Sequence, residues 1–134
     1  MPWLQWHLPE KENVVGITIS IPSVGGELLR NVEVRAGLTN VNPEHKGKIS
    51  ENKFCGKFVG PGGNRRAYTI LCESKISANF ITIQMLEENS QLQINELELV
   101  TSSTGRIQKL FNLYKLNSSI FVQLGKNIIV TLNI

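Results

Sequence analysis

The sequence predicts an all-β fold, an antiparallel β-sandwich of the jelly-roll kind. About six short segments alternate apolar with polar residues, which is typical of half-buried strands. Turn-forming residues separate them, and no convincing long helical pattern interrupts them. With 134 residues and 41% hydrophobic residues, the chain is long and apolar enough for one domain with a real core.

The first clear strand pattern runs from Val14 to Ile21, where Val15, Ile17 and Ile19 alternate with smaller or polar residues. Residues 29–36 alternate again, with Val32 and Val34 expected on the buried face. Further strands are expected at residues 54–59, 68–72, 80–86 and 92–100, with a long surface loop at 37–53.

The last of these strands changes phase. Leu92 and Ile94 have one parity, whereas Leu97 and Leu99 have the other, so the pattern breaks at Asn95-Glu96. A β-bulge there would re-aim two polar side chains. The alternative is a strand that simply changes which face it buries.

The chain divides at a turn-rich boundary into residues 1–100, the predicted sandwich, and residues 101–134, a basic extension. The net charge is +3, and the extension carries Arg106, Lys109, Lys115 and Lys126 with no acidic residue. Within it, the pattern favours a short amphipathic helix at 107–116, followed by a hairpin of 120–124 with 128–132.

Cys55 and Cys72 are the two cysteines of the chain, and each lies beside a strand segment. In a small β-rich chain this favours one disulfide and therefore an extracellular fold. Closing a loop of this length stabilises by roughly 3 kcal/mol on the chain-entropy estimate. The alternative is a pair of buried free thiols in a cytosolic protein.

Composition argues against several function classes. The chain contains no aspartate, so Ser-His-Asp triads and aspartyl dyads cannot form, and we expect a non-catalytic protein. No apolar run is long enough for a transmembrane segment. The first residues lack the features of a signal peptide, so secretion would need a signal upstream of Met1.

Residues 44–66 carry a cluster of cations that would form a basic rim if their loops met at one end of the sandwich. The cluster comprises Lys46, Lys48, Lys53, Lys57, Arg65 and Arg66. Such a rim would contact anionic surfaces; the alternative is an ordinary charged loop surface. No aromatic stripe supports nucleic-acid binding.

Several blocks resemble, in order, those of the F-type lectins (fucolectins) and other discoidin-like domains. They are Pro2-Trp3, Glu33-Val34-Arg35-Ala36-Gly37, Asn52-x-x-Cys55-Gly56, Cys72, Phe80-Ile81-Thr82-Ile83 and Leu92-x-Ile94-x-Glu96-Leu97-Glu98-Leu99. The resemblance covers residues 2–100. It implies a galactose-binding-domain-like jelly roll that binds fucose and related glycans.

The fucose motif itself departs from the family pattern. The family binds sugar hydroxyls with charge-assisted bonds from a His and two Arg (or an Arg and a Lys). Its motif is an Arg, an Asp two residues on and an Arg or Lys five residues after that, and an ungapped alignment puts Ile21, Ser23 and Leu28 at these positions. A displaced site would use Arg30 or Arg35. The alternative is that both arginines are solvated on the polar face of a strand.

The resemblance also implies calcium. The positions that supply a carbonyl and a carboxylate in the family are Asn95 and Glu96 here, and oxygen ligands suit calcium.

Separately, Asn117-Ser118-Ser119 is an N-glycosylation sequon, as expected in a secreted protein.

The sequence therefore predicts a non-catalytic carbohydrate-binding module, related to fucolectins but with a degenerate fucose site. Its partner would be a glycan or glycoprotein. The alternative is an extracellular structural or protein-interaction module that binds no sugar.

Overall fold

The structure, a computed structural model, describes residues 3–23, 25–41, 47–87 and 94–102, together with the backbone of four short strands at 107–110, 113–116, 119–122 and 129–133. The elements of the first part are β1 (Trp3–Ser20), η1 (Gly26–Leu28), β2 (Val32–Gly37), η3 (Ile49–Glu51), β3 (Lys53–Phe58), β4 (Ala67–Met85) and β5 (Glu96–Thr101). The remaining strands are β6 (Ile107–Leu110), β7 (Leu113–Leu116), β8 (Ser119–Val122) and β9 (Ile129–Asn133).

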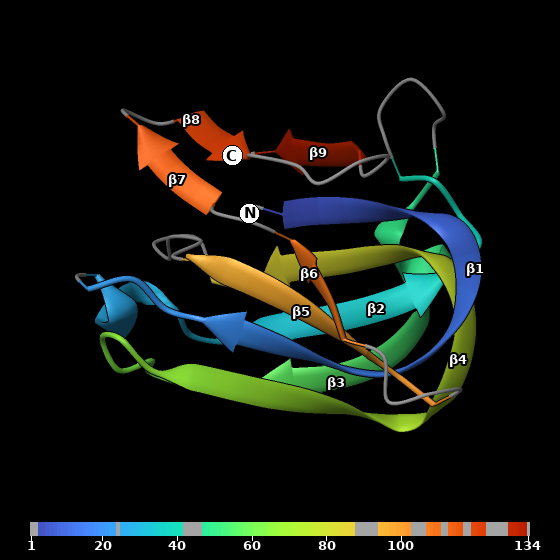
Figure 1. The fold of residues 1–134 in the computed structure, drawn as a ribbon, viewed down its shortest axis with the longest axis horizontal. Coiled ribbons are helices and arrows are strands. Elements are labelled where there is room, and N and C mark those ends of the chain that lie inside the picture. Colours follow the sequence, from blue (N-terminus) through green and yellow to red (C-terminus); the bar gives the residue numbers. More distant parts are fainter. Residues whose placement is uncertain are drawn as a thin grey trace.

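The all-β antiparallel class is confirmed. Strands β1 to β5 form one open antiparallel sheet in the order β3-β2-β4-β1-β5 (Figure 1). The backbone of β6 adds to the free side of β5, and β9 pairs with the first part of β1. Strands β7 and β8 pair with each other.

Two long bent strands organise this sheet. The sequence predicts separate strands at 68–72 and 80–86, but β4 runs continuously from Ala67 to Met85, and β1 runs from Trp3 to Ser20 beside it. Their register jumps twice, between His7 and Glu12 and between Val14 and Gly16. Pro9 lies within the first jump, where its missing N–H removes no ladder hydrogen bond. The extra residues let both strands bend, as Figure 1 shows at its right-hand side.

At the second register jump, the buried face of β1 differs from the predicted one. Val14 is fully buried, whereas Val15 is only partly buried, and Ile17 and Ile19 are buried as expected. Val15 is the additional residue of the irregularity, so the alternation changes phase at that point. A single strand can therefore supply inward-facing residues on both sides of the bend.

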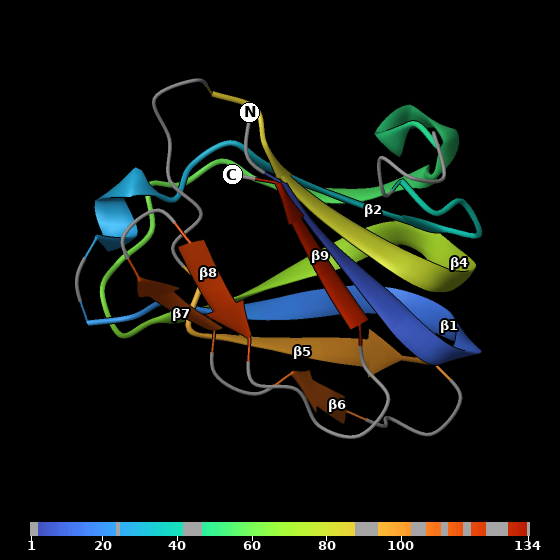
Figure 2. The same cartoon turned by 90° about the horizontal axis from the view of Figure 1, so that it is seen from above.

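The bend gives the sheet two flanks. The β2 flank contains β3, β2, residues 80–85 of β4 and residues 3–7 of β1; the β5 flank contains residues 67–71 of β4, residues 16–20 of β1 and β5. One hydrophobic cluster draws on both flanks, so the core lies between them (Figure 2). Its largest fully buried members are Trp6, Leu4, Leu8, Ile17, Ile19, Leu29, Ile81, Ile83, Met85, Leu97 and Leu99. Burial of this kind contributes about 25 cal/mol per Å² of apolar surface.

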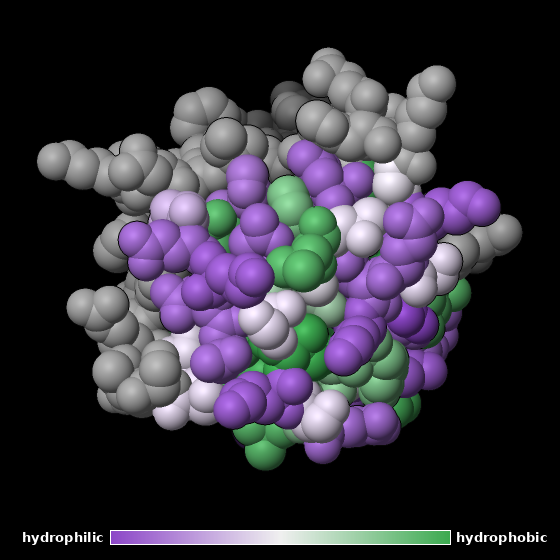
Figure 3. All heavy atoms as spheres, turned by 90° about the vertical axis from the view of Figure 1, so that its right-hand side faces the viewer, coloured by the Kyte–Doolittle hydropathy of each residue, from purple (hydrophilic) through white to green (hydrophobic). Residues whose placement is uncertain are grey.

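The outer surface at the bend is different in character. Figure 3 views it directly and shows hydrophilic side chains around a narrow group of hydrophobic ones. Among the described residues, the large apolar side chains that remain exposed are Leu38, Val59 and Leu71. Single exposed apolar residues are ordinary on a protein surface.

The segment after residue 101 differs from its predicted elements. Residues 107–110 and 113–116 are strands rather than a helix, and β8 pairs with β7 while β9 pairs with β1, instead of forming a hairpin together. The physical reason lies in the sheet, because β5 and the first part of β1 each expose backbone groups that need partners. The division of the chain at residue 100 remains a prediction.

The structure describes only part of the segment in which a bulge is predicted at Asn95-Glu96. β5 begins at Glu96, with Asn95 exposed and Ile94 buried before it. Leu92, whose parity defined the phase break, lies outside the described residues.

Candidate binding pocket

Two loops at one end of the β5 flank are joined along their length. Residues 21–31 follow β1, and residues 59–66 precede β4. Four backbone hydrogen bonds link them: Ile21 N–H to Arg66 O at 2.8 Å, Arg65 N–H to Pro22 O at 3.0 Å, Gly62 N–H to Leu29 O at 3.0 Å and Asn31 N–H to Val59 O at 2.9 Å. The Gly26 N–H donates to Asn64 Oδ1 at 2.8 Å. Loops that satisfy each other's backbone groups are well placed to hold side chains in fixed positions.

Glycine makes this close approach feasible. A Cβ on Gly62 would lie 2.4 Å from Ile21 Cδ1 and 2.8 Å from the Gly26 carbonyl oxygen. Gly60 has a φ of 77°, in the left-handed region that side chains disfavour. Gly60 and Gly62 are therefore structural requirements of the loop pair.

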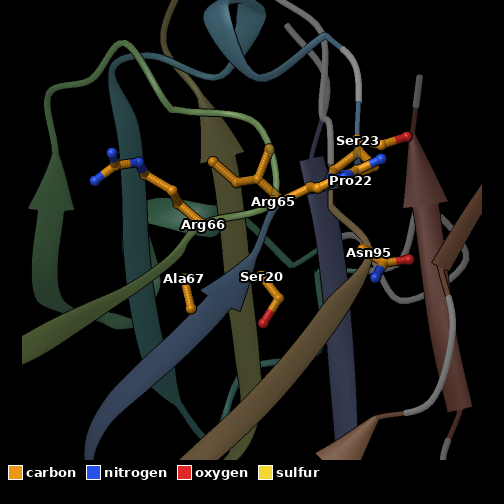
Figure 4. A pocket seen from close by; sticks show the side chains of 8 residues that line it. Ser20, Pro22, Ser23, Arg65, Arg66, Ala67 and Asn95 are labelled. Carbon is orange, nitrogen blue, oxygen red and sulfur yellow. The ribbon is translucent and has the colours of Figure 1, made fainter.

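A pocket of about 580 Å³ opens beside the joined loops. Its lining comes from the end of β1, from both loops and from the approach to β5: Ser20, Ile21, Pro22, Ser23, Arg65, Arg66, Ala67 and Asn95 (Figure 4). The volume falls within the range of small-ligand sites. The pocket therefore combines hydroxyl, amide and guanidinium groups with the apolar surfaces of Ile21, Pro22 and Ala67.

Strand register brings the lining together. Ser20 pairs with Ala67 on one side and with Glu96 on the other, so three segments far apart in sequence meet across adjacent strands. The Asn95 N–H donates to Ser20 O at 2.8 Å and extends this alignment by one residue. The Asn95 side chain remains exposed.

The two arginines take different directions. In Figure 4, Arg65 extends to the side of Pro22 and Ser23, and Arg66 extends to the opposite side. A Cβ on Gly63 would lie 2.8 Å from Arg66 Cδ and 3.1 Å from Arg66 Nε, so the Arg66 side chain lies over Gly63. Arg65 is therefore the guanidinium that faces the same side as Ser23.

Arg65 also has an unusual backbone. Its φ is 58°, in the left-handed region that few non-glycine residues occupy. Its N–H is fixed by the hydrogen bond to Pro22 O. A non-glycine residue held in this conformation by its surroundings is the kind of feature that marks ligand sites.

The sugar-site candidates Arg30 and Arg35 do not come together. Arg30 Nη2 donates to Glu27 O at 3.2 Å, and its Nε lies 3.9 Å from a Glu87 carboxylate oxygen. Arg35 pairs with Glu33 and donates through Nη1 to Asn52 O at 2.9 Å. Arg30 lies in the loop before β2 and Arg35 lies on β2, and each is engaged with its own neighbours.

The calcium candidates lie at the pocket, but the described residues do not fit the ion. Asn95 lines the pocket and Glu96 is next to it in register with Ser20. Calcium takes six to eight oxygen ligands, whereas the described residues contain no group of three His, Cys, Asp or Glu that could hold a metal. Two arginines also line the pocket. The calcium hypothesis therefore stays a prediction.

The disulfide prediction agrees with the structure. Cys55 on β3 and Cys72 on β4 are bonded, and neither is a free thiol. The predicted glycosylation site, Asn117, lies outside the described residues.

The basic segment 44–66 does not form a single rim. Lys46 lies outside the described residues, and Lys53 and Lys57 are exposed on β3, in register with β2. Only Arg65 and Arg66 from this segment reach the pocket. Lys48 is exposed just before η3, so the described cations are divided among this turn, the pocket and an edge strand, where lysine discourages edge-to-edge pairing.

A second pocket of about 380 Å³ lies elsewhere, between the end of β2, η3 and the bend of β4. Its polar centre, Asn52, is 2% exposed and already bonded to both backbone groups of Thr39. Because the Asn52 amide already hydrogen-bonds to the loop backbone, the first pocket is the better candidate site.

The sequence alone does not identify Ser20 as a site residue, and it does not predict that Arg65 and Asn95 line the same pocket. A local signal did exist for Arg65, since the sequence placed it in a basic loop after a glycine-rich turn. No local pattern indicates that Ser20, Arg65 and Asn95 share a pocket, because the strand register decides it.

Comparisons of the chain with protein-family models, with curated proteins and with solved structures give no significant match. Within the described part of the chain, no helix is long and apolar enough to cross a membrane.

Proposed function

We propose that the chain is a non-catalytic carbohydrate-binding module, related to the F-type lectins, whose bent sheet is a variant of the galactose-binding-domain-like jelly roll. The observation that carries this proposal is the location of the pocket. Ile21 and Ser23, which stand at two positions of the family's sugar motif in the alignment, both line it. Arg65 supplies a guanidinium from the neighbouring loop, in place of the motif arginine that the chain lacks.

The chemistry of the pocket suits a sugar. The Arg65 guanidinium and the Asn95 amide can donate to neighbouring hydroxyls, and the Ser20 and Ser23 hydroxyls can both donate and accept. Pro22 and Ala67 offer small apolar surfaces to the C–H face of a ring. A few convergent polar groups on an apolar lining are typical of small-ligand sites.

The absence of catalysis in this proposal rests on the available groups. In the part of the lining that the structure describes, there are serines but no histidine, lysine or carboxylate that could act as their base. His7 stacks on Phe80, with ring centroids 4.4 Å apart, on the β2 flank. A disulfide-closed binding module of this kind belongs in an extracellular setting, where it would contact a glycan or glycoprotein.

A glycan array on the purified chain, run with and without calcium, tests the proposal. We expect retention of at least one class of glycan, and we expect Arg65→Asn to weaken it. Asparagine tolerates the left-handed backbone, so this variant removes the guanidinium without forcing the loop to change. Lys75→Gln is the matched control, because Lys75 is an exposed cation on β4, away from the pocket lining.

The second candidate function is an extracellular protein-interaction module that binds no sugar. The loss of the family's sugar motif favours it, since Ile21, Ser23 and Leu28 stand where the family has its Arg, Asp and Arg or Lys. A folded chain that retains no glycan on the array would overturn the carbohydrate proposal and leave this second function.

A further inference from the structure

We propose that the ligand of the pocket is an acidic glycan, one that carries a carboxylate or a sulfate ester, and that Arg65 binds this anionic group. This inference rests on the proposed carbohydrate function and specifies the class of sugar. Among the described residues, the pocket lining includes Arg65 and Arg66 and no acidic residue, and Glu96 follows Asn95 at its margin. A neutral sugar needs no guanidinium in the lining, whereas an anion does.

The arginines of the two loops differ in how free they are to bind an anion. Arg30 is held near the Glu87 carboxylate and bonded to Glu27 O. Arg66 lies over Gly63, where a Cβ would be 2.8 Å from its Cδ. Arg65 and Arg66 are both exposed, and Arg65 is the one that shares the side of Pro22 and Ser23 in Figure 4. Arg65 is therefore the arginine best placed to bind a ligand.

The planar guanidinium matches the geometry of the proposed group. It presents paired N–H donors that meet two oxygens of a carboxylate or sulfate at once, and such bonds are shorter and stronger than neutral ones. The backbone of Arg65 is fixed by its hydrogen bond to Pro22 O at 3.0 Å, so ligand binding has to order the side chain but not the loop around it.

The polar groups beside Arg65 would bind the hydroxyls of the sugar ring, whereas Arg65 binds its anionic group. Ser20, Ser23 and Asn95 line the same pocket and can hydrogen-bond hydroxyls of the ring that bears the anion. The joint requirement separates a glycan site from general attraction of anions, since a bare sulfate ion offers no ring hydroxyls to these groups.

Paired probes test the inference on the whole chain. Binding of sulfated and uronate-containing oligosaccharides is measured by calorimetry against their desulfated or carboxyl-reduced forms. We expect the acidic forms to bind at least about tenfold more tightly, because hydrogen bonds to charged groups are the stronger class. Higher salt should weaken the acidic forms more than the neutral ones.

Variants assign the effect to Arg65. Arg65→Asn should lower the affinity for the acidic probe about tenfold and bring it to that of the neutral probe, whereas Arg65→Lys should retain part of the preference. Lys75→Gln, an exposed cation outside the pocket, should change neither affinity. An equal loss with Lys75→Gln would overturn the proposal in favour of diffuse electrostatic attraction.

Other outcomes separate this inference from the proposed function. Equal binding of neutral and acidic forms would overturn the acidic class and leave the carbohydrate module standing. Binding of inorganic sulfate, anionic lipid vesicles or DNA as tightly as the sulfated sugar would also overturn it, since the sugar ring would then contribute nothing to the affinity. Binding of no glycan, acidic or neutral, would overturn both proposals.

Discussion

Cys55 and Cys72 join one edge of the β2 flank to one edge of the β5 flank. Among the described residues, Cys55 lies on β3, which pairs with β2 alone, and Cys72 lies on β4 next to residues 67–71, which pair with β1 alone. Their Cα atoms are 4.0 Å apart. The disulfide therefore crosses a seam where the β2 flank meets the β5 flank, and no ladder hydrogen bonds between β3 and β4 hold that seam.

Removing this link should destabilise the fold markedly. For the double variant Cys55→Ala with Cys72→Ala, we expect the free energy of unfolding to fall by roughly 3 kcal/mol, because the unfolded chain gains conformational freedom. Denaturant unfolding measures the change. A reducing agent should lower the stability of the wild type to a similar level and leave the double variant unaffected. A double variant as stable as the wild type would show that the seam holds without the bond.

The seam is also tightly packed at Gly56. A Cβ there would lie 2.6 Å from the Leu71 carbonyl oxygen and 2.7 Å from Ile70 Cγ2, so Gly56→Ala must push β3 away from β4. We expect a loss of about 1–3 kcal/mol in unfolding free energy.

Gly63→Ala is the matched control for this prediction. Its Cβ would meet mainly the flexible Arg66 side chain, which can move aside. A smaller loss for Gly63→Ala than for Gly56→Ala in the same denaturant series supports a close-packed seam, and equal losses would contradict it.

Asn52 holds the loop that follows β2. Its amide accepts from the Thr39 N–H at 3.0 Å and donates to Thr39 O at 2.9 Å, and the side chain is buried. Asn52→Ala leaves both backbone groups of Thr39 without these partners, so we expect a loss of about 1–3 kcal/mol. Ser74→Ala, at an exposed position on β4, is the control and should change stability by less than about 0.5 kcal/mol. Equal effects would show that Thr39 finds other partners.

The strands could be predicted because their patterns are local. Val32 and Val34 are fully buried in β2 while Glu33 and Arg35 are partly exposed, as the alternation indicates. The continuity of β1 and β4 could not be predicted in this way, because Pro9 and the polar residues 72–75 look like breaks between strands. They lie at the register jumps, where a strand bends without ending.

The candidate site was harder to predict than the strands. The glycine-rich turn and the cations after it were visible, but Ser20, Arg65 and Asn95 become neighbours only through the register of β1 with β4 and β5. The prediction of Arg30 and Arg35 as sugar-binding residues rests on their charge, whereas in the structure each donates to a nearby backbone oxygen. Charge in a sequence does not reveal which cations already have partners.

The backbone of Arg65 allows its structural role to be separated from its proposed binding role. At a φ of 58°, asparagine and glycine fit well, whereas a β-branched residue is strained. We expect Arg65→Asn and Arg65→Gly to change the free energy of unfolding by less than about 0.5 kcal/mol, and Arg65→Val to lower it by about 1 kcal/mol or more. Thermal or denaturant unfolding checks these values. If Arg65→Asn proved as destabilising as Arg65→Val, the guanidinium would be supporting the loops themselves, and a loss of ligand in that variant could not be assigned to a lost contact.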